Sequence, residues 1–503
     1  MGGLSIADSP NFGRFPFSLI LFPSPRIARI VGLAEHLNKQ EQITDSQFRM
    51  LFQIVLLFDE IGLQSWSKFN CRLAAKSLEN FHLFETKEHL LRALYVLNLS
   101  RKPISNEKAM MIELQVMKYF YHNKLDLKEI GLVCMAFHKT QTKFRTPLME
   151  HVAEKLVDEV GNQMNDQLCV SSILKGIFSS EHRLDASLLD RLGDRLQATD
   201  AFSSSFLVLT KFLAIRKKYR RYDERLIGTV LDSFAQQDTV RIKELSRLLL
   251  NLLFFDVQLN AKQIGKFNEQ FEKIKSKNAL YRVEYLLSVY ALASHGLIRK
   301  EEILTIYEAE FIRVLRSKHG EVPFFVMNLN NILKLFGDSN YKDVAFKDRE
   351  LLKLFNNFES LSKTEVYARF KKFDRYPSKL YLCYQALKDS LEGRVHLVHL
   401  MPGCRYPQIV ITPKKTILKD YPFPVAVNVG AGLSVVRIPA PDLYCDVESQ
   451  RLSGYYKMEN EMLRKMGFRL FELENNLVSH TTSELKLYLT EQVFDNLDEQ
   501  KAA

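Results

Sequence analysis

The stretch that decides the fold is Thr239–Ser276, which reads TVRIKELSRLLLNLLFFDVQLNAKQIGKFNEQFEKIKS. In both halves, apolar residues recur three and four positions apart, which is the spacing of one face of a helix. The residues on these two stripes are Ile242, Leu245, Leu248, Leu249 and Leu252, then Ile264, Phe267, Phe271 and Ile274. The pattern breaks around Asp256–Asn260. We therefore expect two helices joined by a short turn, and neither helix buries its apolar face without a neighbour.

Similar helix pairs recur along the chain at a nearly constant interval. Such units begin at Thr86, Leu125, Met164, Ala201, Thr239 and Lys277, so the steps are 39, 39, 37, 38 and 38 residues. Identity between the units is low, and only the apolar pattern repeats. A period of about 38 residues that holds over six units predicts a mainly α protein built as a stacked α-helical repeat solenoid.

Composition narrows the class of protein. The chain has 503 residues, 46% of them hydrophobic, which suits a folded solenoid with a terminal domain. Its formal net charge of +11 favours an acidic partner such as RNA, DNA or an anionic membrane surface. The six cysteines form no CxxC pair and have no His at finger-like spacing, so we expect neither a disulfide framework nor a zinc site. We also expect no cofactor and no other metal. The sequence contains no run of 18 apolar residues, so we expect no membrane span.

Four segments follow from the changes in pattern along the chain. Residues 1–39 are basic, contain serines and are poor in acids, as in a mitochondrial transit peptide, although three prolines interrupt the helix that such a peptide forms. An incomplete N-terminus is the alternative. Residues 40–312 form the predicted solenoid, in which 40–85 are an irregular first unit. Residues 313–392 stay helical but lose the period, and 393–503 form a small α/β domain.

The α/β prediction rests on short β-branched runs that begin near residue 393. The expected strands are Val395–Val398, Gln408–Ile411, Pro424–Val429, Leu433–Ile438 and Phe468–Leu473. The expected helices are Arg451–Met466 and Ser483–Asn496.

The tail at residues 451–496 resembles a RAP domain. The matching positions are Leu452, Gly454, Lys457, Leu463, Gly467, Phe468, Tyr488 and Leu489. Helical repeats followed by such a domain resemble the FAST kinase domain-containing family of mitochondrial RNA-binding proteins, and Arg241–Leu253 is similar to the repeat phrase of that family. The resemblance implies a mitochondrial matrix protein that binds mitochondrial transcripts. It also implies a role in RNA processing, mRNA stability or translation, with other RNA-processing proteins as partners.

The sequence can be searched for the motifs of two enzymatic activities, a kinase and a metal-dependent nuclease. The chain contains no GxGxxG loop, HRD or DFG, so a kinase is not expected. The RAP fold is similar to the PD-(D/E)xK nuclease fold, and the position of its acidic metal ligand corresponds here to Asn428. Asp442, Asp446 and Glu448 lie nearby in sequence, so a metal-dependent ribonuclease stays an alternative. The second alternative is a helical scaffold that binds proteins. We expect a binding protein, with no catalytic residues.

The densest basic run lies at the predicted turn between the two helices of the unit that begins at Ala201. Its members are Arg216, Lys217, Lys218, Tyr219, Arg220, Arg221 and Tyr222. Basic side chains there would follow a phosphate backbone, and the tyrosines would stack on bases. The alternative is a solvated turn with inward-packed tyrosines.

Two further basic groups are candidates for RNA contacts. Lys139, Lys143 and Arg145 occupy the corresponding turn of the unit that begins at Leu125, and would join the first run in a stripe. Lys371, Lys372 and Arg375 alternate with aromatic residues within Lys363–Lys379. That alternation suits single-stranded RNA, but its spacing of three also suits ordinary packing of a helix.

Overall fold

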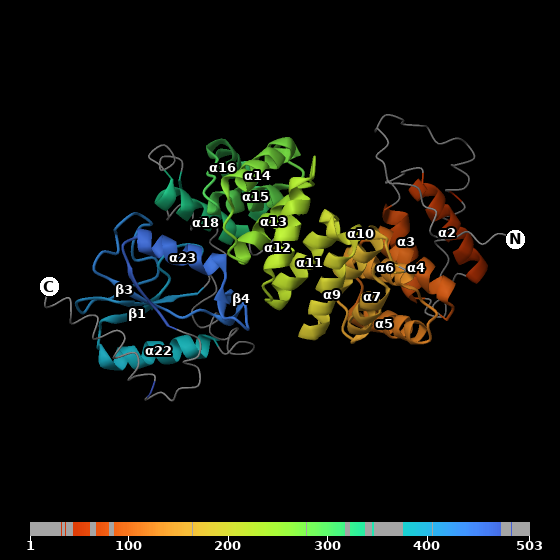
Figure 1. Cartoon of the computed structure of the whole chain (residues 1–503), viewed down its shortest axis with the longest axis horizontal. Coiled ribbons are helices and arrows are strands. Elements are labelled where there is room, and N and C mark those ends of the chain that lie inside the picture. Colours follow the sequence, from red (N-terminus) through yellow and green to blue (C-terminus); the bar gives the residue numbers. More distant parts are fainter. Residues whose placement is uncertain are drawn as a thin grey trace. The chain divides into compact units, whose positions relative to one another are not determined.

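The computed structural model describes residues 32, 36, 44–60, 67–79, 85–162, 164–277, 279–316, 322–337, 345–346, 376–404, 406–473 and 484. Over these residues the chain is mainly helical, with a small sheet near the C-terminus (Figure 1). The fold divides into two compact units. The first comprises residues 1–152 and 179–182, and the second comprises 153–178 and 183–503.

The first unit is built from helices that pack side by side. Their bounds are α2 (Asp45–Glu60), α3 (Ser67–Glu79), α4 (Lys87–Ser100), α5 (Asn106–Tyr121) and α6 (Leu127–Lys139), and α7 (Leu148–Glu159) begins here and ends in the second unit. Side-chain caps fix several helix starts, because the first backbone N–H groups of a helix have no partner within it. Asp126, for example, forms a capping box with Glu129 at the start of α6.

The helices of the second unit continue the pairs. Their bounds are α8 (Gln167–Ser179), α9 (Ala186–Ala198), α10 (Asp200–Ser203), α11 (Phe206–Tyr219), α12 (Glu224–Ala235), α13 (Ile242–Phe254), α14 (Ala261–Ile274), α15 (Arg282–Ser294), α16 (Lys300–Tyr307), α17 (Ala309–Arg316) and α18 (Val322–Phe336). A 3-10 turn, η4 (Lys275–Lys277), follows α14. The first helices of successive pairs contact one another, as α11, α13 and α15 do, and the second helices α9, α12 and α14 do likewise.

The stretch at residues 239–276 forms the helix pair that its pattern predicts. All five residues of the first stripe are buried in α13. Of the second stripe, Phe267, Phe271 and Ile274 are buried in α14, whereas Ile264 is half-buried. Asn260 caps α14 in a capping box with Gln263, so the break at 256–260 is the turn between the helices.

The C-terminal α/β domain places a mixed sheet between two helices. Its elements are α22 (Tyr376–Ser390), β1 (Val395–Val398), β2 (Gln408–Ile411), β3 (Ser434–Arg437), η6 (Pro441–Leu443), β4 (Tyr444–Asp446), β5 (Arg451–Leu452), α23 (Gly454–Lys465) and β6 (Arg469–Glu472). The sheet order is β1-β2-β3-β6, in which β3 and β6 are parallel and the other pairs are antiparallel. The helices α22 and α23 cover opposite faces of this sheet (Figure 1). The apolar side of α22 packs on β1, β2 and β3.

Two sequence predictions in this domain are wrong. Pro424–Val429 is a turn region, not a strand, because its backbone binds the end of α23 and not a neighbouring strand. Asn428 N–H donates to the Lys465 carbonyl at 3.1 Å, and Gly430 N–H donates to the Met466 carbonyl at 2.7 Å. Both carbonyls lie where a helix leaves its C=O groups unpaired. Residues 451–452 belong to β5, so the predicted helix begins three residues later, at Gly454.

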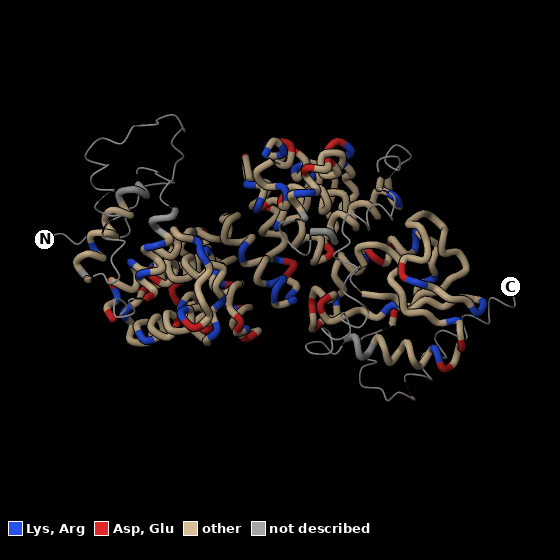
Figure 2. Tube along the Cα trace, turned by 180° about the vertical axis from the view of Figure 1, so that it is seen from behind, with Lys and Arg blue, Asp and Glu red and all other residues tan. Residues whose placement is uncertain are grey.

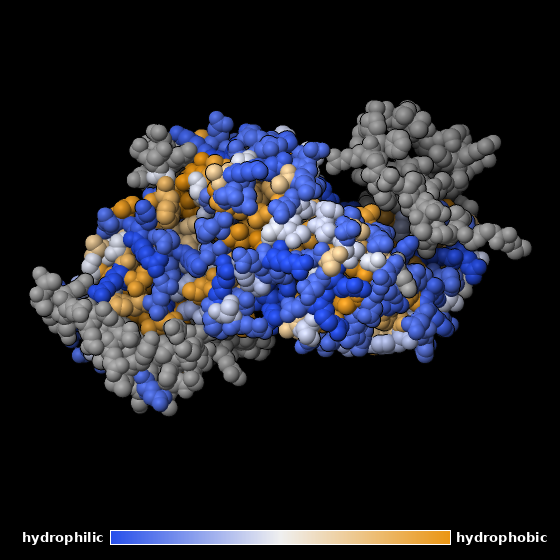
Figure 3. Space-filling model, viewed as in Figure 1, coloured by the Kyte–Doolittle hydropathy of each residue, from blue (hydrophilic) through white to orange (hydrophobic). Residues whose placement is uncertain are grey.

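The predictions for residues 1–39 and for the helix Ser483–Asn496 fall almost entirely outside the described residues. Within the described part of the chain, no helix is both long and apolar enough to cross a membrane. In one view, hydrophilic side chains cover most of the described surface, with apolar areas between them (Figure 3).

Candidate nucleic-acid interface

The basic turn, Arg216–Tyr222, begins in the last turn of α11, which ends at Tyr219, and only its last three residues lie in the predicted connection between helices. Its charges are largely paired within the protein. The Arg216 side chain is buried, with a relative exposure of 6%, and its guanidinium pairs with Asp190 of α9 and with Asp223 at 2.7 Å. The Tyr219 hydroxyl accepts the Leu184 N–H at 2.9 Å. Lys218 donates to the Phe178 carbonyl at 2.7 Å.

The second half of the basic turn contacts the α/β domain. Arg220, which has a left-handed backbone with φ of 54°, donates to the Pro441 carbonyl at 2.5 Å. Its own carbonyl accepts the Val447 N–H at 3.3 Å. Arg221 pairs with Glu448 and, at 2.9 Å, with Asp190. The Arg451 guanidinium lies 3.8 Å from the centre of the Tyr222 ring.

The start of α23 contacts the end of α13 beside this turn. A Cβ atom placed on Gly454 would lie only 2.0 Å from the Leu253 carbonyl oxygen, so the two backbones touch there. The Tyr455 hydroxyl donates to the Leu250 carbonyl at 3.1 Å, and the Lys457 ammonium pairs with Asp256. Two of the residues matched to the RAP pattern, Gly454 and Lys457, therefore lie at a contact between the α/β domain and the helical region.

Gly467 has a different structural role. It follows α23 with a φ of 88°, and the next N–H, from Phe468, donates to the Leu463 carbonyl at 3.1 Å. This is the usual glycine-terminated end of a helix, in which a left-handed residue lets the chain turn back on itself. The other motif residue, Tyr488, lies outside the described residues.

The remaining predicted basic groups are not brought beside the turn by any described contact. Lys139, Lys143 and Arg145 belong to the first unit, and the basic turn belongs to the second. Lys143 and Arg145 both pair with Glu181, at 3.5 and 3.8 Å. Lys371, Lys372 and Arg375 fall outside the described residues.

In the second unit, the first helices of three successive pairs are much more basic than the second helices. Together α8, α11 and α13 contain seven Lys and Arg residues and a single acidic residue, Glu244. The second helices α9, α12 and α14 contain six basic and six acidic residues. Figure 2 marks the two kinds of charge along the trace. Within these three helix pairs, the excess positive charge therefore belongs to the first helices.

Three of these cations form what we call the cation row: Lys175 on α8, Lys211 on α11 and Arg247 on α13. Lys175 and Lys211 are half-buried and Arg247 is exposed. Lys211 and Arg247 form no ion pair with any residue that the structure describes. Burial, together with repulsion from Arg247 and Lys175, lowers the pKa of the Lys211 ammonium to about 7. The row is a place where positive charge is concentrated and an anion would relieve the repulsion.

Apolar and aromatic side chains accompany the row. Leu168 and Phe178 on α8 are exposed, and the Lys218 ammonium lies 5.7 Å from the centre of the Phe178 ring. On the other side, the Lys243 ammonium of α13 lies 5.2 Å from the half-buried Tyr281 ring. Cations beside accessible rings are the combination that single-stranded nucleic acids use, since rings stack on bases and cations bind phosphates.

The sequence contains a signal for the cation row that its apolar pattern does not reveal. The three positions are 36 residues apart in each case (175, 211 and 247). This spacing differs from the steps of 37 to 39 residues between the starts of the apolar units. Lys211 and Arg247 are each the sixth residue of their helices, and Lys175 is the ninth residue of α8, about one helical turn further along. The equal spacing of 36 residues is therefore the signal that a search for charged positions could have found.

The carboxylates of the ribonuclease alternative have separate partners. Asp442 accepts the Tyr406 hydroxyl at 3.0 Å, Asp446 accepts the Glu448 N–H at 3.0 Å, and Glu448 itself pairs with Arg221. The central strands β2 and β3 contain no acidic residue. In the described part of the chain, no group of three or more His, Cys, Asp or Glu residues is arranged to hold a metal ion.

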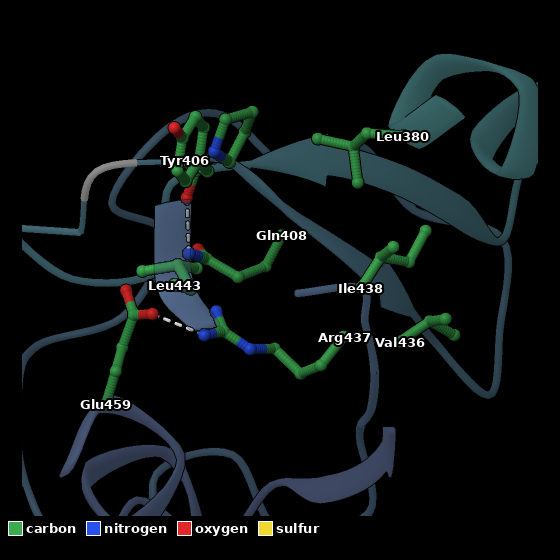
Figure 4. Close-up of a pocket in the computed structure, with 9 residues that line it drawn as sticks. Leu380, Tyr406, Gln408, Val436, Arg437, Ile438, Leu443 and Glu459 are labelled. Carbon is green, nitrogen blue, oxygen red and sulfur yellow. Dashed lines mark hydrogen bonds and ion pairs between the residues drawn. The ribbon is translucent and has the colours of Figure 1, made fainter. Parts of the chain in front are cut away.

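A small recess in the α/β domain is lined by charged groups that already pair. Arg437 of β3 and Glu459 of α23 point toward each other across it and form an ion pair, while Gln408 donates to the Tyr406 carbonyl at 2.5 Å (Figure 4). The Arg437 guanidinium also lies 4.8 Å from the centre of the Tyr456 ring. The recess has a volume of about 10 Å³, which is room for about one water molecule and far too small for a ligand. We therefore interpret the Arg437–Glu459 pair as a structural link between sheet and helix.

Comparison with known proteins adds no family to this description. No protein-family model matches the chain, and a search of curated proteins finds no match.

Proposed function

We propose that this protein binds single-stranded RNA along the face formed by the first helices α8, α11 and α13. The observation that carries the proposal is the cation row, Lys175, Lys211 and Arg247, in a layer of helices with seven basic residues and one acidic residue. Three cations, Arg247, Lys175 and Arg241, and only one carboxylate, Glu244, act on Lys211, so a phosphate would add counter-charge there.

The arrangement suits a single strand better than a duplex. Phosphate contacts alone would not distinguish the two, but rings at both ends of the row offer surfaces on which unpaired bases can stack. Phe178 and Tyr281 are those rings, and each has a lysine ammonium within 6 Å of its centre. The bases of a duplex stack on one another and are not available to side chains in this way.

The proposal includes a repeat solenoid, a RAP-like C-terminal domain and a mitochondrial location. Consecutive helix pairs with matching contacts between first helices and between second helices support the repeat architecture. The RAP-like assignment and the role in transcript processing, stability or translation come from the resemblance in residues 451–496. Imaging of the tagged full-length protein would test the location, and a distribution outside mitochondria would contradict it.

Affinity for RNA tests the main proposal. We would measure the binding of a fluorescein-labelled 20-nucleotide RNA by anisotropy for the parent protein and for the triple variant Lys175→Gln, Lys211→Gln, Arg247→Gln. A matched control removes three exposed cations from the second helices, by Arg191→Gln, Arg225→Gln and Lys262→Gln. At pH 6, below the Lys211 pKa of about 7, both variants lose nearly the same net charge, so the comparison isolates position.

The expected loss for the row variant is roughly 10- to 100-fold in affinity at low salt. The slope of log K against log salt should also fall by about 2, because each phosphate contact to a single strand contributes about 0.7. The control variant should change the affinity and the salt slope only slightly. Equal losses in the two variants, or no binding by the parent, would refute the proposal.

A further inference from the structure

The basic turn has the composition of a phosphate site, yet in the structure a carboxylate from the α/β domain occupies it. The Arg221 guanidinium pairs with Glu448, which lies in the turn after β4. Glu448 is the more exposed partner, with 71% of its side chain accessible against 19% for Arg221. An ion pair with one partner in water contributes little net stability, so another anion can replace that partner at small cost.

Arg221 would keep a partner if Glu448 left. Its second guanidinium nitrogen pairs with Asp190 at 2.9 Å, and Asp190 also pairs with the buried Arg216. Release of Glu448 therefore does not leave a buried cation without compensation. The firmer contacts of the α/β domain with α13, at Gly454 and Lys457, do not involve Glu448.

The turn is also within reach of an RNA strand on the proposed face. It continues directly from α11, the helix that carries Lys211, and Lys217 and Lys218 occupy its last turn. From Lys211 to Lys218 the helix rises by about 10 Å, or 1.5 Å for each residue. A strand bound at Lys211 and extending along α11 would meet Lys218 and then the turn that holds Arg221.

From these contacts we propose that Glu448 masks a second phosphate site at Arg221, for which bound RNA competes. The inference rests on the proposed function. In this scheme the α/β domain lowers RNA affinity through one replaceable carboxylate, and RNA that reaches the turn displaces that carboxylate from Arg221. The domain keeps its contacts with α13 throughout.

The test compares two single substitutions in the full chain with the same labelled RNA. Glu448→Gln removes the competing charge and keeps the shape of the side chain. Glu461→Gln removes one exposed carboxylate of the same domain, which pairs with Arg464 and not with the turn. Glu448→Gln should tighten binding about threefold and raise the salt slope by about 0.7, the contribution of one added phosphate contact. Glu461→Gln should leave both unchanged.

Three outcomes separate this inference from the proposed function. If Glu448→Gln leaves the affinity and the salt slope unchanged, or if both substitutions tighten binding equally, the competition is refuted. If the cation-row variant loses binding in the same series, the proposed function survives that result. If the parent protein and Glu448→Gln both fail to bind RNA, the proposed function and this inference fall together.

Discussion

Substitution of Gly454 tests the contact between the α/β domain and the helical region. In Gly454→Ala the new Cβ would lie 2.0 Å from the Leu253 carbonyl oxygen, and its other near neighbours, the Leu253 carbon and the Asp256 Cα, are also backbone atoms. A carbon and a carbonyl oxygen approach to about 3.3 Å, so α23 must move by about 1.3 Å. No side-chain rotation at α13 can relieve this clash.

The size of the effect follows from what that movement breaks. The Tyr455 hydroxyl bond to the Leu250 carbonyl, now 3.1 Å long, would stretch beyond bonding distance, and the Lys457–Asp256 pair would loosen. A neutral hydrogen bond contributes about 1 kcal/mol, an exposed ion pair contributes about 0–1 kcal/mol, and overpacking costs about 1–3 kcal/mol. Alanine restores about 0.4–1 kcal/mol by restricting the unfolded chain. We expect a net loss of about 1–5 kcal/mol.

The assay is hydrogen exchange of the amides at 250–257 and 454–458, together with the thermal midpoint. Gly228→Ala in α12 is the control, because a Cβ there meets nothing within 4 Å and should stabilise the helix by up to about 1 kcal/mol. Gly454→Ala should speed exchange at both segments, and Gly228→Ala should not. Unchanged exchange and an unchanged midpoint in Gly454→Ala would refute the close contact between α13 and α23.

Three other predictions follow from buried or crowded charges. RNA affinity should weaken as pH rises from 6 to 8.5, because Lys211, with a pKa of about 7, loses its charge in that range. Lys211→Arg should remove most of this pH dependence, and a variant with the same pH profile as the parent would contradict the prediction. Glu459→Gln should destabilise the α/β domain by about 3–5 kcal/mol in denaturant unfolding, because it leaves the buried Arg437 without its carboxylate; a midpoint equal to the parent's would contradict it. Glu113→Gln should speed exchange of the two amides that its buried carboxylate accepts, and should cost about 2–4 kcal/mol; unaltered exchange would show that the carboxylate does not hold that turn.

The helical part of the fold could be predicted from the sequence because its signals are local. Apolar residues at helical spacing give the buried side of α13, and a polar residue such as Asn260 gives the start of α14. Both signals depend on residues within a few positions of each other. The prediction for Pro424–Val429 is wrong because it too used local signals alone. The β-branched residues of this segment suggest a strand, but Asn428 forms its backbone hydrogen bond with Lys465 at the end of α23, 37 residues along the chain.

The site was harder to predict because its partners are distant in sequence. The density of charge at Arg216–Tyr222 suggests exposure, but Arg216 is buried by Asp190, 26 residues before it, and Arg221 is covered by Glu448, 227 residues after it. No local pattern contains that information. The cation row shows the converse, since Lys175, Lys211 and Arg247 are isolated in sequence and become neighbours only when the first helices stack.

The most direct test of the central claim is to locate RNA on the full-length protein by ultraviolet crosslinking, with the crosslinked peptides identified by mass spectrometry. The account predicts crosslinks in residues 167–179, 206–222 and 242–254 and at Tyr281. Phe178 and Tyr281 should be the favoured sites, because their rings would lie against bases. Crosslinks confined to the second helices α9, α12 and α14, or no crosslinked peptide from a protein that remains folded, would contradict it.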